Sequence, residues 1–408
     1  MPGRGDRDKP RVLHIVTAPQ AVRGLLRGQL RYLREAGFDV TVVSSPGAEA
    51  EQVGREDGVA FVPVRMEREI APWRDLASLW RLLGLVRRLR PAIVHTGTPK
   101  AGLLGGLAAW LGGVPCRIYT LYGVRCETSR GWRRRLLMSA EWCACRLAYR
   151  VVCVSPSLRR KVVGLGIADG SRTVLLARGS ANGIDMARFS PSPGRALAAK
   201  WRREQLGIPQ DAPVAGFVGR LTPDKGVPEL VLAFETLKDA YPDLRLLLIG
   251  PREPSNPLPE VCARAIAAEP RILGLGFIAD PAPYYHVMDC VALPSHREGF
   301  PTVLLEAAAA AKPVVATDAT GVADAVVHEV TGVITPVGDL SALSRALARV
   351  LDDPDWAAQL GQAARERAAA RFTSAALWEE IVKLYRAMID QQTAACRGKS
   401  PAVPAVTR

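Results

Sequence analysis

Two glutamates eight positions apart, Glu298 and Glu306, lie in the run PSHREGFPTVLLEA at residues 294–307. A glycine-containing loop here turns into an apolar, alanine-rich segment. We expect a helix to begin at Pro301, because the fixed φ of proline suits the first helical position. Free amides from Thr302 onward would then point out of the helix N-terminus, where an anion such as a diphosphate is favoured.

The spacing of this acid pair suggests a carbohydrate ligand. Glu298 would lie on the loop before the helix, and Glu306 would lie about one and a half turns inside it. One carboxylate can accept hydrogen bonds from two vicinal hydroxyls, so the pair is suited to a sugar ring and a nucleotide ribose. An exposed loop acid followed by an unrelated acid on a helix face would give the same pattern.

A second motif, GRLTPDKG at residues 219–226, carries two cations. It directly follows an apolar run, 214–218, that predicts a strand, so Arg220 and Lys225 would lie in a loop at the carboxyl end of that strand. If the strands are near neighbours, these cations would face the helix N-terminus at Pro301. They could clamp a diphosphate and stabilise it as a leaving group. The alternative is two surface cations on an ordinary loop.

The elements that must position these motifs alternate between strands and helices. A helix is expected over residues 22–36, and similar helical patterns separate many of the strands. Such alternation predicts an α/β fold with two doubly wound, Rossmann-like domains, whose ligands bind at the carboxyl ends of the strands and in the crevice between the domains. The predicted strands are 11–17, 39–44, 59–64, 92–95, 117–121, 150–154, 214–218, 244–249, 272–274, 290–293, 313–317 and 332–335.

A chain of 408 residues exceeds what one hydrophobic core usually supports, which favours two domains. A proline-rich stretch at 182–193 is typical of a linker between them. The predicted parts are a disordered N-terminus at 1–10, an N-terminal domain at 11–190, a C-terminal domain at 191–372, a helix at 373–392 that packs back on the N-terminal domain, and a disordered tail at 393–408.

Composition excludes several classes of protein. Hydrophobic residues make up 48% and charged residues 23% of the chain, as in ordinary soluble proteins. The eight cysteines form no regular framework, which indicates a reduced, cytoplasmic setting. The uncharged stretch 101–116 is glycine-rich and shorter than the ~20 residues that span a bilayer. No second Cys/His pair lies near Cys143 and Cys145, so no metal site is expected.

The formal net charge of +14 lies wholly in the first half of the chain. Residues 1–192 hold 31 Lys and Arg against 15 Asp and Glu, whereas residues 193–408 hold 23 against 25. The basic residues interleave with Leu and Trp in the segments 23–34, 73–90 and 130–137. This pattern favours an anionic membrane surface as partner and not nucleic acid. A solvated, arginine-rich helix face is the other interpretation.

The two motifs, together with NGID at 182–185 and Gly250, resemble those of the retaining glycosyltransferases of family 4, which have the GT-B fold. The resemblance covers residues 11–389. The runs HTGTPKAGLLG at 95–105 and FDVTVVSSPG at 38–47 are most similar to the capsular and exopolysaccharide enzymes of that family.

The resemblance implies roles for the residues that match the motifs. Arg220 and Lys225, beside Gly219, would bind the diphosphate of the donor, and Glu306 would bind its ribose. Glu298 would bind the donor sugar together with the backbone amides of Gly299 and Phe300. Family members use no metal or other cofactor, and the leaving diphosphate assists the attacking hydroxyl, so no protein nucleophile is required. Among these residues Glu298, Arg220 and Lys225 are the predicted catalytic ones.

The N-terminal domain departs from the family pattern. Tyr122 stands where many relatives have a histidine, and Gly97 stands where a second histidine is common after His95. Tyrosine donates a hydrogen bond to a sugar hydroxyl but is a poor base at neutral pH. We expect Gly24, His95 and Tyr122 on the acceptor side.

These observations predict transfer of a hexose or N-acetylhexosamine from a nucleotide diphosphate sugar, UDP-linked, to a lipid-linked saccharide in surface polysaccharide biosynthesis. The chain would act in the cytoplasm, peripherally on the inner face of the cell membrane. A nucleotide-sugar 2-epimerase of the same fold is one alternative, although that chemistry needs acids in the acid-poor first half. A basic membrane-binding or nucleic-acid-binding module without activity is the other, and it leaves the motif residues unexplained.

Overall fold

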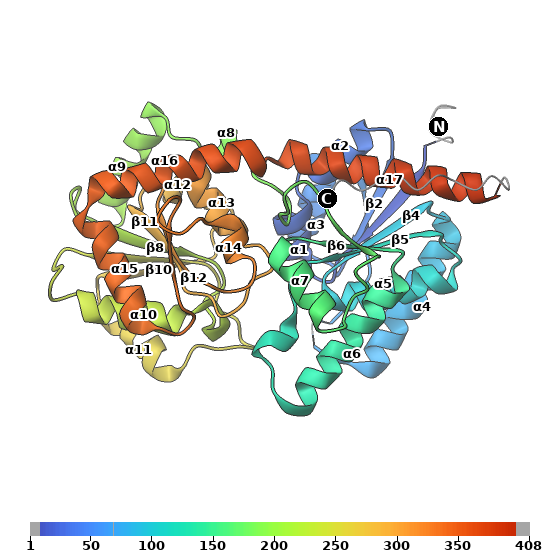
Figure 1. Cartoon of the computed structure of the whole chain (residues 1–408), viewed down its shortest axis with the longest axis horizontal. Helices are drawn as coiled ribbons and strands as arrows, with labels where there is room; N and C mark the ends of the chain where they lie inside the picture. The colour runs from blue at the N-terminus through green and yellow to red at the C-terminus, as the bar shows by residue number, and fades with distance from the viewer. Residues whose placement is uncertain (1–8, 68, 397–408) are drawn as a thin grey trace. The chain divides into compact units, whose positions relative to one another are not determined.

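The structure is a computed structural model that describes residues 9–67 and 69–396. Its chain divides into two compact units (Figure 1). Unit 1 holds residues up to 154, residues 159–177 and residues from 375 onward, and unit 2 holds residues 155–158 and 178–374. The change of unit after residue 177 lies upstream of the boundary predicted at 190. The predicted disordered ends fall largely on residues 1–8 and 397–408, outside the described residues.

Unit 1 is built on a parallel sheet in the order β3-β2-β1-β4-β5-β6-β7. Every neighbouring pair in it is parallel, so helices must connect the strands and cover both faces. Its strands are β1 (Arg11–Ile15), β2 (Asp39–Ser44), β3 (Ala60–Pro63), β4 (Ile93–Gly97), β5 (Cys116–Leu121), β6 (Arg150–Cys153) and β7 (Thr173–Leu175).

Alternate residues of β1 enter two different cores. Val12 packs with α1, α2, α3 and α17, whereas Leu13 and Ile15 pack with α4 and α5, so these two groups of helices cover opposite faces of the sheet. In chain order the helices are α1 (Pro19–Leu26), α2 (Gln29–Glu35), α3 (Ala48–Asp57), α4 (Pro72–Leu89), α5 (Pro99–Leu111), η2 (Arg125–Thr128), α6 (Gly131–Leu147), α7 (Pro156–Gly164) and α17 (Ser374–Cys396).

The single helix predicted over residues 22–36 is wrong, because the chain breaks into α1 and α2 at Gly28. This residue has a φ of 77°, in the left-handed region that favours glycine. A Cβ at this position would lie 2.7 Å from the ring of Trp378, and its amide donates to Asp57 Oδ2 at 2.9 Å. The close approach of α17 therefore requires a glycine at the break.

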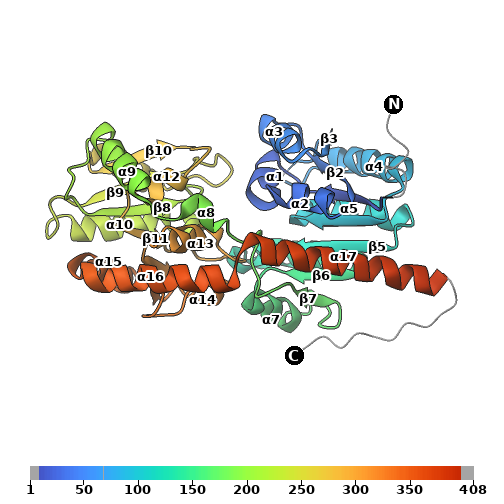
Figure 2. The ribbon, with the colours of Figure 1, turned by 90° about the horizontal axis from the view of Figure 1, so that it is seen from above.

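Helix α17 belongs to the core of unit 1, where Ile381, Tyr385 and Met388 are buried among residues of β1, β2 and β4. Figure 2 shows the helix running beside the strands of this unit. The sequence predicted such a helix at 373–392. In the structure it continues to Cys396, so residues 393–396 are helical and not part of a disordered tail.

Unit 2 contains a second parallel sheet in the order β10-β9-β8-β11-β12-β13. Its strands are β8 (Val214–Val218), β9 (Arg245–Ile249), β10 (Ile272–Gly276), β11 (Cys290–Leu293), β12 (Val314–Thr317) and β13 (Val333–Thr335). Its helices are α8 (Met186–Phe189), α9 (Pro193–Gln205), η3 (Pro223–Lys225), α10 (Val227–Leu237), α11 (Glu260–Ala268), α12 (Ala282–Tyr285), α13 (Thr302–Ala309), α14 (Val322–Ala325), α15 (Leu340–Asp352) and α16 (Pro354–Arg371).

The linker predicted at residues 182–193 is instead a folded part of unit 2. Ile184 pairs with Thr373 through backbone hydrogen bonds, and the buried ring of Phe189 packs edge-on against Tyr285 at 5.6 Å. Pro193 of this stretch is the first residue of α9, directly after the N-cap Ser192.

Candidate functional site

The order of strands in unit 2 reverses between β8 and β11, which are neighbours in the sheet. Loops that leave the carboxyl ends of two such strands diverge to opposite faces, and ligands bind at this point in doubly wound sheets. The loop after β8 is the motif 219–226, and the loop after β11 contains Glu298. The fold thus brings the two motifs of the sequence to one place.

Two close contacts join these loops. Gly226 has a φ of 73°, and a Cβ there would lie 1.9 Å from the carbonyl oxygen of Pro294, so only glycine fits. The amide of His296 donates to the carbonyl of Asp224 at 3.0 Å. The backbones of the two loops therefore hold each other in register.

Lys225 and Glu298 meet directly, with Nζ 2.6 Å from Oε1. The hydroxyl of Ser295 donates to the same carboxylate oxygen at 2.8 Å. The Lys225 side chain is 21% exposed and that of Glu298 only 9%, so the acid is nearly enclosed while part of the cation reaches solvent. Charge-assisted hydrogen bonds of this length fix both side chains.

Arg220 lies in a larger ionic network. It pairs with Glu253 and, more loosely, with Asp224, whose Oδ2 is 3.8 Å from Nη2. Arg297 also reaches Asp224 Oδ2, at 2.8 Å. Burial alone would raise the pKa of Asp224, but hydrogen bonding and these guanidinium groups hold that pKa below its ordinary value.

The acidic partners of the predicted cations are not apparent from the sequence. Asp224 and Arg297 lie inside the two motifs, directly before Lys225 and Glu298. This adjacency was the sequence signal that they belong to the same site. Glu253 follows β9, the other neighbour of β8, so its place at the same sheet edge followed from strand order alone. The predicted cationic clamp is thus an interlaced set of cations and acids.

Glu306 lies on α13 and accepts a hydrogen bond from the hydroxyl of Tyr285 at 2.5 Å. Tyr285 ends α12 and is fully buried. Burial raises the pKa of Glu306 above its ordinary value, although the hydrogen bond from Tyr285 opposes that shift. The tyrosine was not foreseen, because nothing in the sequence links these two positions.

The helix that carries Glu306 begins one residue later than predicted. Pro301 is the N-cap of α13, with an extended backbone at φ −76° and ψ 104°, so the helix starts at Thr302. The carbonyl of Pro301 accepts a hydrogen bond from the amide of Leu304 at 3.1 Å, as an N-cap residue can without being helical itself.

Tight packing fixes the turn between Glu298 and α13. The side chain of Phe300 is 5% exposed and packs against Phe372 at 5.3 Å between ring centroids. Gly321, with a φ of 84°, approaches so closely that a Cβ would lie 2.1 Å from the carbonyl oxygen of Gly299. The backbone at Gly299 and Phe300 is therefore set by packing.

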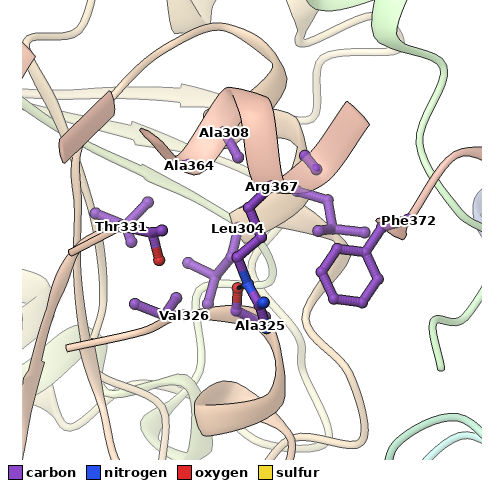
Figure 3. A pocket seen from close by; sticks show the side chains of 11 residues that line it. Leu304, Ala308, Ala325, Val326, Thr331, Ala364, Arg367 and Phe372 are labelled. Atoms are coloured by element: carbon purple, nitrogen blue, oxygen red, sulfur yellow. Dashed lines mark hydrogen bonds between the residues drawn. The ribbon is translucent and has the colours of Figure 1, made fainter. Parts of the chain in front are cut away.

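Figure 3 shows the packing behind α13, where Leu304, Arg367 and Phe372 line a small cavity. Its volume of about 10 Å³ is at most the space of one water molecule. It cannot hold a sugar or a nucleotide, so it is part of the support of α13. Within the described part of the chain, no cluster of three or more His, Cys, Asp or Glu is placed to hold a metal ion.

In unit 1 the reversal of strand order falls between β1 and β4, and His95 lies on β4. Its Nδ1 is 2.6 Å from the hydroxyl of Tyr385, and its Nε2 is 2.6 Å from Oγ1 of Thr120. The ring is 2% exposed and stacks on His14 at 4.3 Å. Burial holds the pKa of His95 well below its ordinary value, so the ring is neutral and bonded within the core.

Tyr122, the other aromatic residue of the predicted acceptor side, follows β5. A Cβ on Gly97 would lie 2.7 Å from its ring, so the glycine and the tyrosine fit together. Desolvation raises the pKa of Tyr122, which keeps its hydroxyl protonated as a hydrogen-bond donor. Gly24 is exposed on α1.

Comparison with known proteins gives two family models that together span most of the chain. Residues 8–179 match the glycosyl transferase 4-like domain, and residues 200–367 match the glycosyl transferases group 1 domain.

A capsular polysaccharide biosynthesis glycosyltransferase of Staphylococcus aureus, CapM, is 34% identical over 93% of this chain and 98% of its own. A UDP-Gal:alpha-D-GlcNAc-diphosphoundecaprenol alpha-1,3-galactosyltransferase of Escherichia coli is 25% identical over 86% of this chain and 90% of its own.

Solved structures show the same fold. HepE of Anabaena, in complex with UDP and glucose, has a TM-score of 0.77 at 20% identity and covers 93% of this chain and 100% of its own. WaaG, a glycosyltransferase involved in lipopolysaccharide biosynthesis, has a TM-score of 0.72 at 16% identity, covering 92% of this chain and 99% of its own.

Proposed function

This chain belongs to the glycosyltransferases of family 4, which have the GT-B fold, and we propose that it builds a surface polysaccharide such as a capsule or exopolysaccharide. In this proposal it transfers a hexose or N-acetylhexosamine from a UDP-sugar to a lipid-linked saccharide, with retention of anomeric configuration. The names of the Staphylococcus aureus and Escherichia coli relatives support the pathway and the acceptor class. The UDP complexes of the structural neighbour support the donor.

The observation that carries this proposal is the contact between Lys225 and Glu298 where the strand order of unit 2 reverses. A diphosphate at this edge would draw Lys225 and Arg220 toward its oxygens. Asp224 and Glu253 would then keep Arg220 oriented, because ionic partners on both sides restrict a guanidinium group. Glu298, once released by the lysine, would accept hydrogen bonds from the hydroxyls of the donor sugar.

The nucleotide would extend toward α13. Glu306 offers one carboxylate oxygen to the ribose while Tyr285 holds the other at 2.5 Å. The amides at the start of α13 would add partial positive charge on the diphosphate side. Gly299 and Phe300, whose backbone is set by packing, would present their amides to the donor.

The reaction requires no protein nucleophile in this scheme. The acceptor hydroxyl oxygen bonds to the anomeric carbon on the face from which the diphosphate departs, and the bond from that carbon to the diphosphate oxygen breaks. The hydroxyl proton passes to the departing diphosphate. Lys225 and Arg220 stabilise the charge that develops on the leaving group, which is the task a preorganised cationic site performs best. No metal or other cofactor takes part in the proposal.

We place this activity on the cytoplasmic side of the membrane, where lipid-linked acceptors and nucleotide sugars meet. Among the described residues, no helix combines the length and apolar character that a bilayer-spanning segment needs. In this proposal the chain associates peripherally with the membrane through its basic first half, which holds 31 Lys and Arg against 15 Asp and Glu. Unit 1 would face the acceptor, with the hydroxyl of Tyr122 as one donor to it.

A donor panel with and without a lipid-linked saccharide tests the proposal. We expect UDP-sugars to raise the unfolding temperature by mass action and sugar to appear on the lipid with its configuration retained. Transfer with inverted configuration, or C2 inversion of the donor without acceptor, would replace the proposed reaction by another of the same fold. Binding of polynucleotides without any turnover would contradict it altogether.

A further inference from the structure

Among the described residues of unit 1, five tryptophans are exposed to solvent. The three most exposed are Trp73 at 85%, Trp132 at 75% and Trp80 at 62%, whereas Trp110 on α5 is 55% and Trp142 on α6 is 47% exposed. Large apolar side chains scattered singly on a surface need no explanation, but a concentration of them marks an interaction site. Two of the three lie on α4 and the third lies on α6.

These tryptophans lie on one side of unit 1. Helix α5 packs between α4 and α6, and the three helices form one layer (Figure 1). On α4 the residues Leu82 and Val86 are buried toward the sheet, whereas Trp73 and Trp80, seven positions apart, form a stripe on the opposite side. The layer therefore turns its aromatic residues away from the core.

Helix α6 repeats this pattern. Ala144 and Cys145 are buried, while Trp132 and Leu136, four positions apart, are 75% and 42% exposed. Both α4 and α6 thus present a tryptophan and leucine stripe on the outside of the layer, since Leu76 on α4 is 45% exposed as well.

The charge of this layer is mostly positive. Helices α4 and α6 together carry eight arginines and only two acids, Asp75 and Glu141. Asp75 is bonded to Lys100 at 2.8 Å, and Glu141 is buried at 5% exposure beneath α6. Before α4, Glu67 pairs with Arg74 at 3.1 Å and Glu69 pairs with Arg125 at 3.5 Å. Arginines remain in excess over acids beside the tryptophans, so the net charge there is positive.

We propose that this surface, defined by Trp73, Leu76, Trp80, Trp132, Leu136 and the arginines of α4 and α6, docks on an anionic lipid bilayer. Tryptophan and leucine enter the interfacial zone of a bilayer, and arginines bind the lipid phosphates. A protein partner would need an apolar surface of its own for the tryptophans and leucines, with acidic residues placed to pair with the arginines between them. A bilayer with anionic headgroups provides both features at once.

The position of the surface suits a lipid-linked acceptor, and this part of the inference rests on the proposed function. In a parallel sheet each connecting helix begins at the edge where the preceding strand ends. Trp73 in the first turn of α4 and Trp132 in the first turn of α6 therefore lie toward the carboxyl edge, from which Tyr122 also emerges. The bond between Lys100 and Asp75 joins the starts of α5 and α4 at this edge. A saccharide held in the membrane by its lipid would reach the acceptor-side loops from here.

Sedimentation with lipid vesicles tests the surface. We expect the full chain to bind vesicles containing phosphatidylglycerol, and the variant W73S/W80S/W132S to bind them about tenfold more weakly or worse, with binding that falls further at high salt. Trp201→Ser is the matched control, because Trp201 on α9 of unit 2 is 57% exposed and should bind like wild type. Circular dichroism and thermal unfolding would confirm that the variants are folded.

Three outcomes would overturn the inference: equal binding of wild type and triple variant, equal loss in Trp201→Ser, or wild-type binding to neutral phosphatidylcholine vesicles alone. A change of oligomeric state in the triple variant without any change in vesicle binding would assign the surface to a second copy of the chain instead.

UDP-induced thermal stabilisation, measured in the same samples without lipid, should be unchanged in the triple variant. Its absence in wild type would count against the proposed donor site and leave the membrane surface standing.

Discussion

The two units have sheets of the same design but place different chemistry at the same position. In both, the strand order reverses between the first and fourth strands of the unit, β1 and β4 in unit 1 and β8 and β11 in unit 2. In unit 2 the loops there hold an ion pair, Lys225 with Glu298, that is partly open to solvent. In unit 1 the strand β4 itself carries a neutral His95, which is bonded to Thr120 and Tyr385 inside the core.

The difference teaches that the fold determines where the loops meet, whereas the side chains determine what can bind there. A cation paired with an acid at the surface can exchange that acid for a phosphate oxygen. A buried neutral network is already satisfied, and it stiffens its surroundings rather than recruiting an anion. The binding of a diphosphate is thus expected in unit 2, and unit 1 is left with uncharged hydrogen-bond donors.

Removal of the cation of unit 2 should have the largest effect on this comparison. We expect Lys225→Ala to lower turnover by ~10²-fold or more, as the loss of one preorganised donor to a developing charge often does. Lys238→Ala is the control, because Lys238 in the same unit is 30% exposed and pairs with Glu235 away from the sheet edge. Steady-state rates at saturating donor would measure the effect, and turnover equal to that of the control would remove Lys225 from the catalytic set.

A buried acid of unit 1 offers a contrast with Glu298, because Glu141 has the hydroxyl of Tyr119 as its partner instead of a cation. Burial raises the pKa of Glu141 from 4.5 to about 7. The native state therefore binds the extra proton between these values, and the free energy of unfolding falls as the pH rises from about 4.5 to 7.

Glu141→Gln should remove that dependence, because the amide carries no charge to desolvate. We expect the free energy of unfolding of this variant to exceed that of wild type by about 2 kcal/mol at pH 8 and to differ little from it at pH 5. The gain at pH 8 is smaller than the full pKa shift corresponds to, because the buried amide also loses hydrogen bonds to water. Urea unfolding at the two pH values measures it. If Glu260→Gln, an exposed change on α11, gave the same difference, burial of Glu141 would not be the cause.

The loss of an acid that the proposal assigns to binding should have a smaller effect than the loss of Lys225. We expect Glu306→Gln to weaken UDP binding about tenfold, because a neutral amide accepts the ribose hydroxyls less strongly than a carboxylate does. Isothermal titration with UDP measures this affinity. Unchanged affinity for UDP would separate Glu306 from the ribose.

Much of the fold was predictable because parallel strands buried on both faces are continuous apolar runs. Strands β2, β8 and β11 have the bounds expected from the sequence. The strand β7 was missed, although β13, which is equally short, was predicted. The break at Gly28 was also missed, because the residue that requires a glycine there, Trp378, lies 350 positions further along the chain.

The site was predictable only in part. Motif spacing identified Lys225 and Glu298, and strand order then brought them together. The spacing of the motifs did not reveal that Arg220 and Lys225 are paired with acids, because an ion pair depends on distances that sequence spacing does not fix. The hydrogen-bond partner of Glu306 is Tyr285 of α12, another element of unit 2, and no local sequence pattern predicts this contact.

The smallest effect we expect concerns that partner, Tyr285. Tyr285→Phe removes one hydrogen bond from Glu306 but leaves the buried ring in place, so we expect UDP affinity to fall by about threefold and turnover at saturating donor to remain near wild type. Tyr241→Phe is the matched control, because Tyr241 also donates to an acid of unit 2, Asp352, at 2.7 Å but at the surface.

A second measurement separates a positioning role of Tyr285 from simple loss of packing. The hydrogen bond from Tyr285 lowers the pKa of Glu306, whose burial raises it, so the variant should raise that pKa further. If ribose binding requires the ionised acid, UDP affinity falls as the pH drops through this pKa, and in Tyr285→Phe the fall should begin at a higher pH. A parallel loss of affinity at every pH would mean that Tyr285 acts only through packing of α12 against α13.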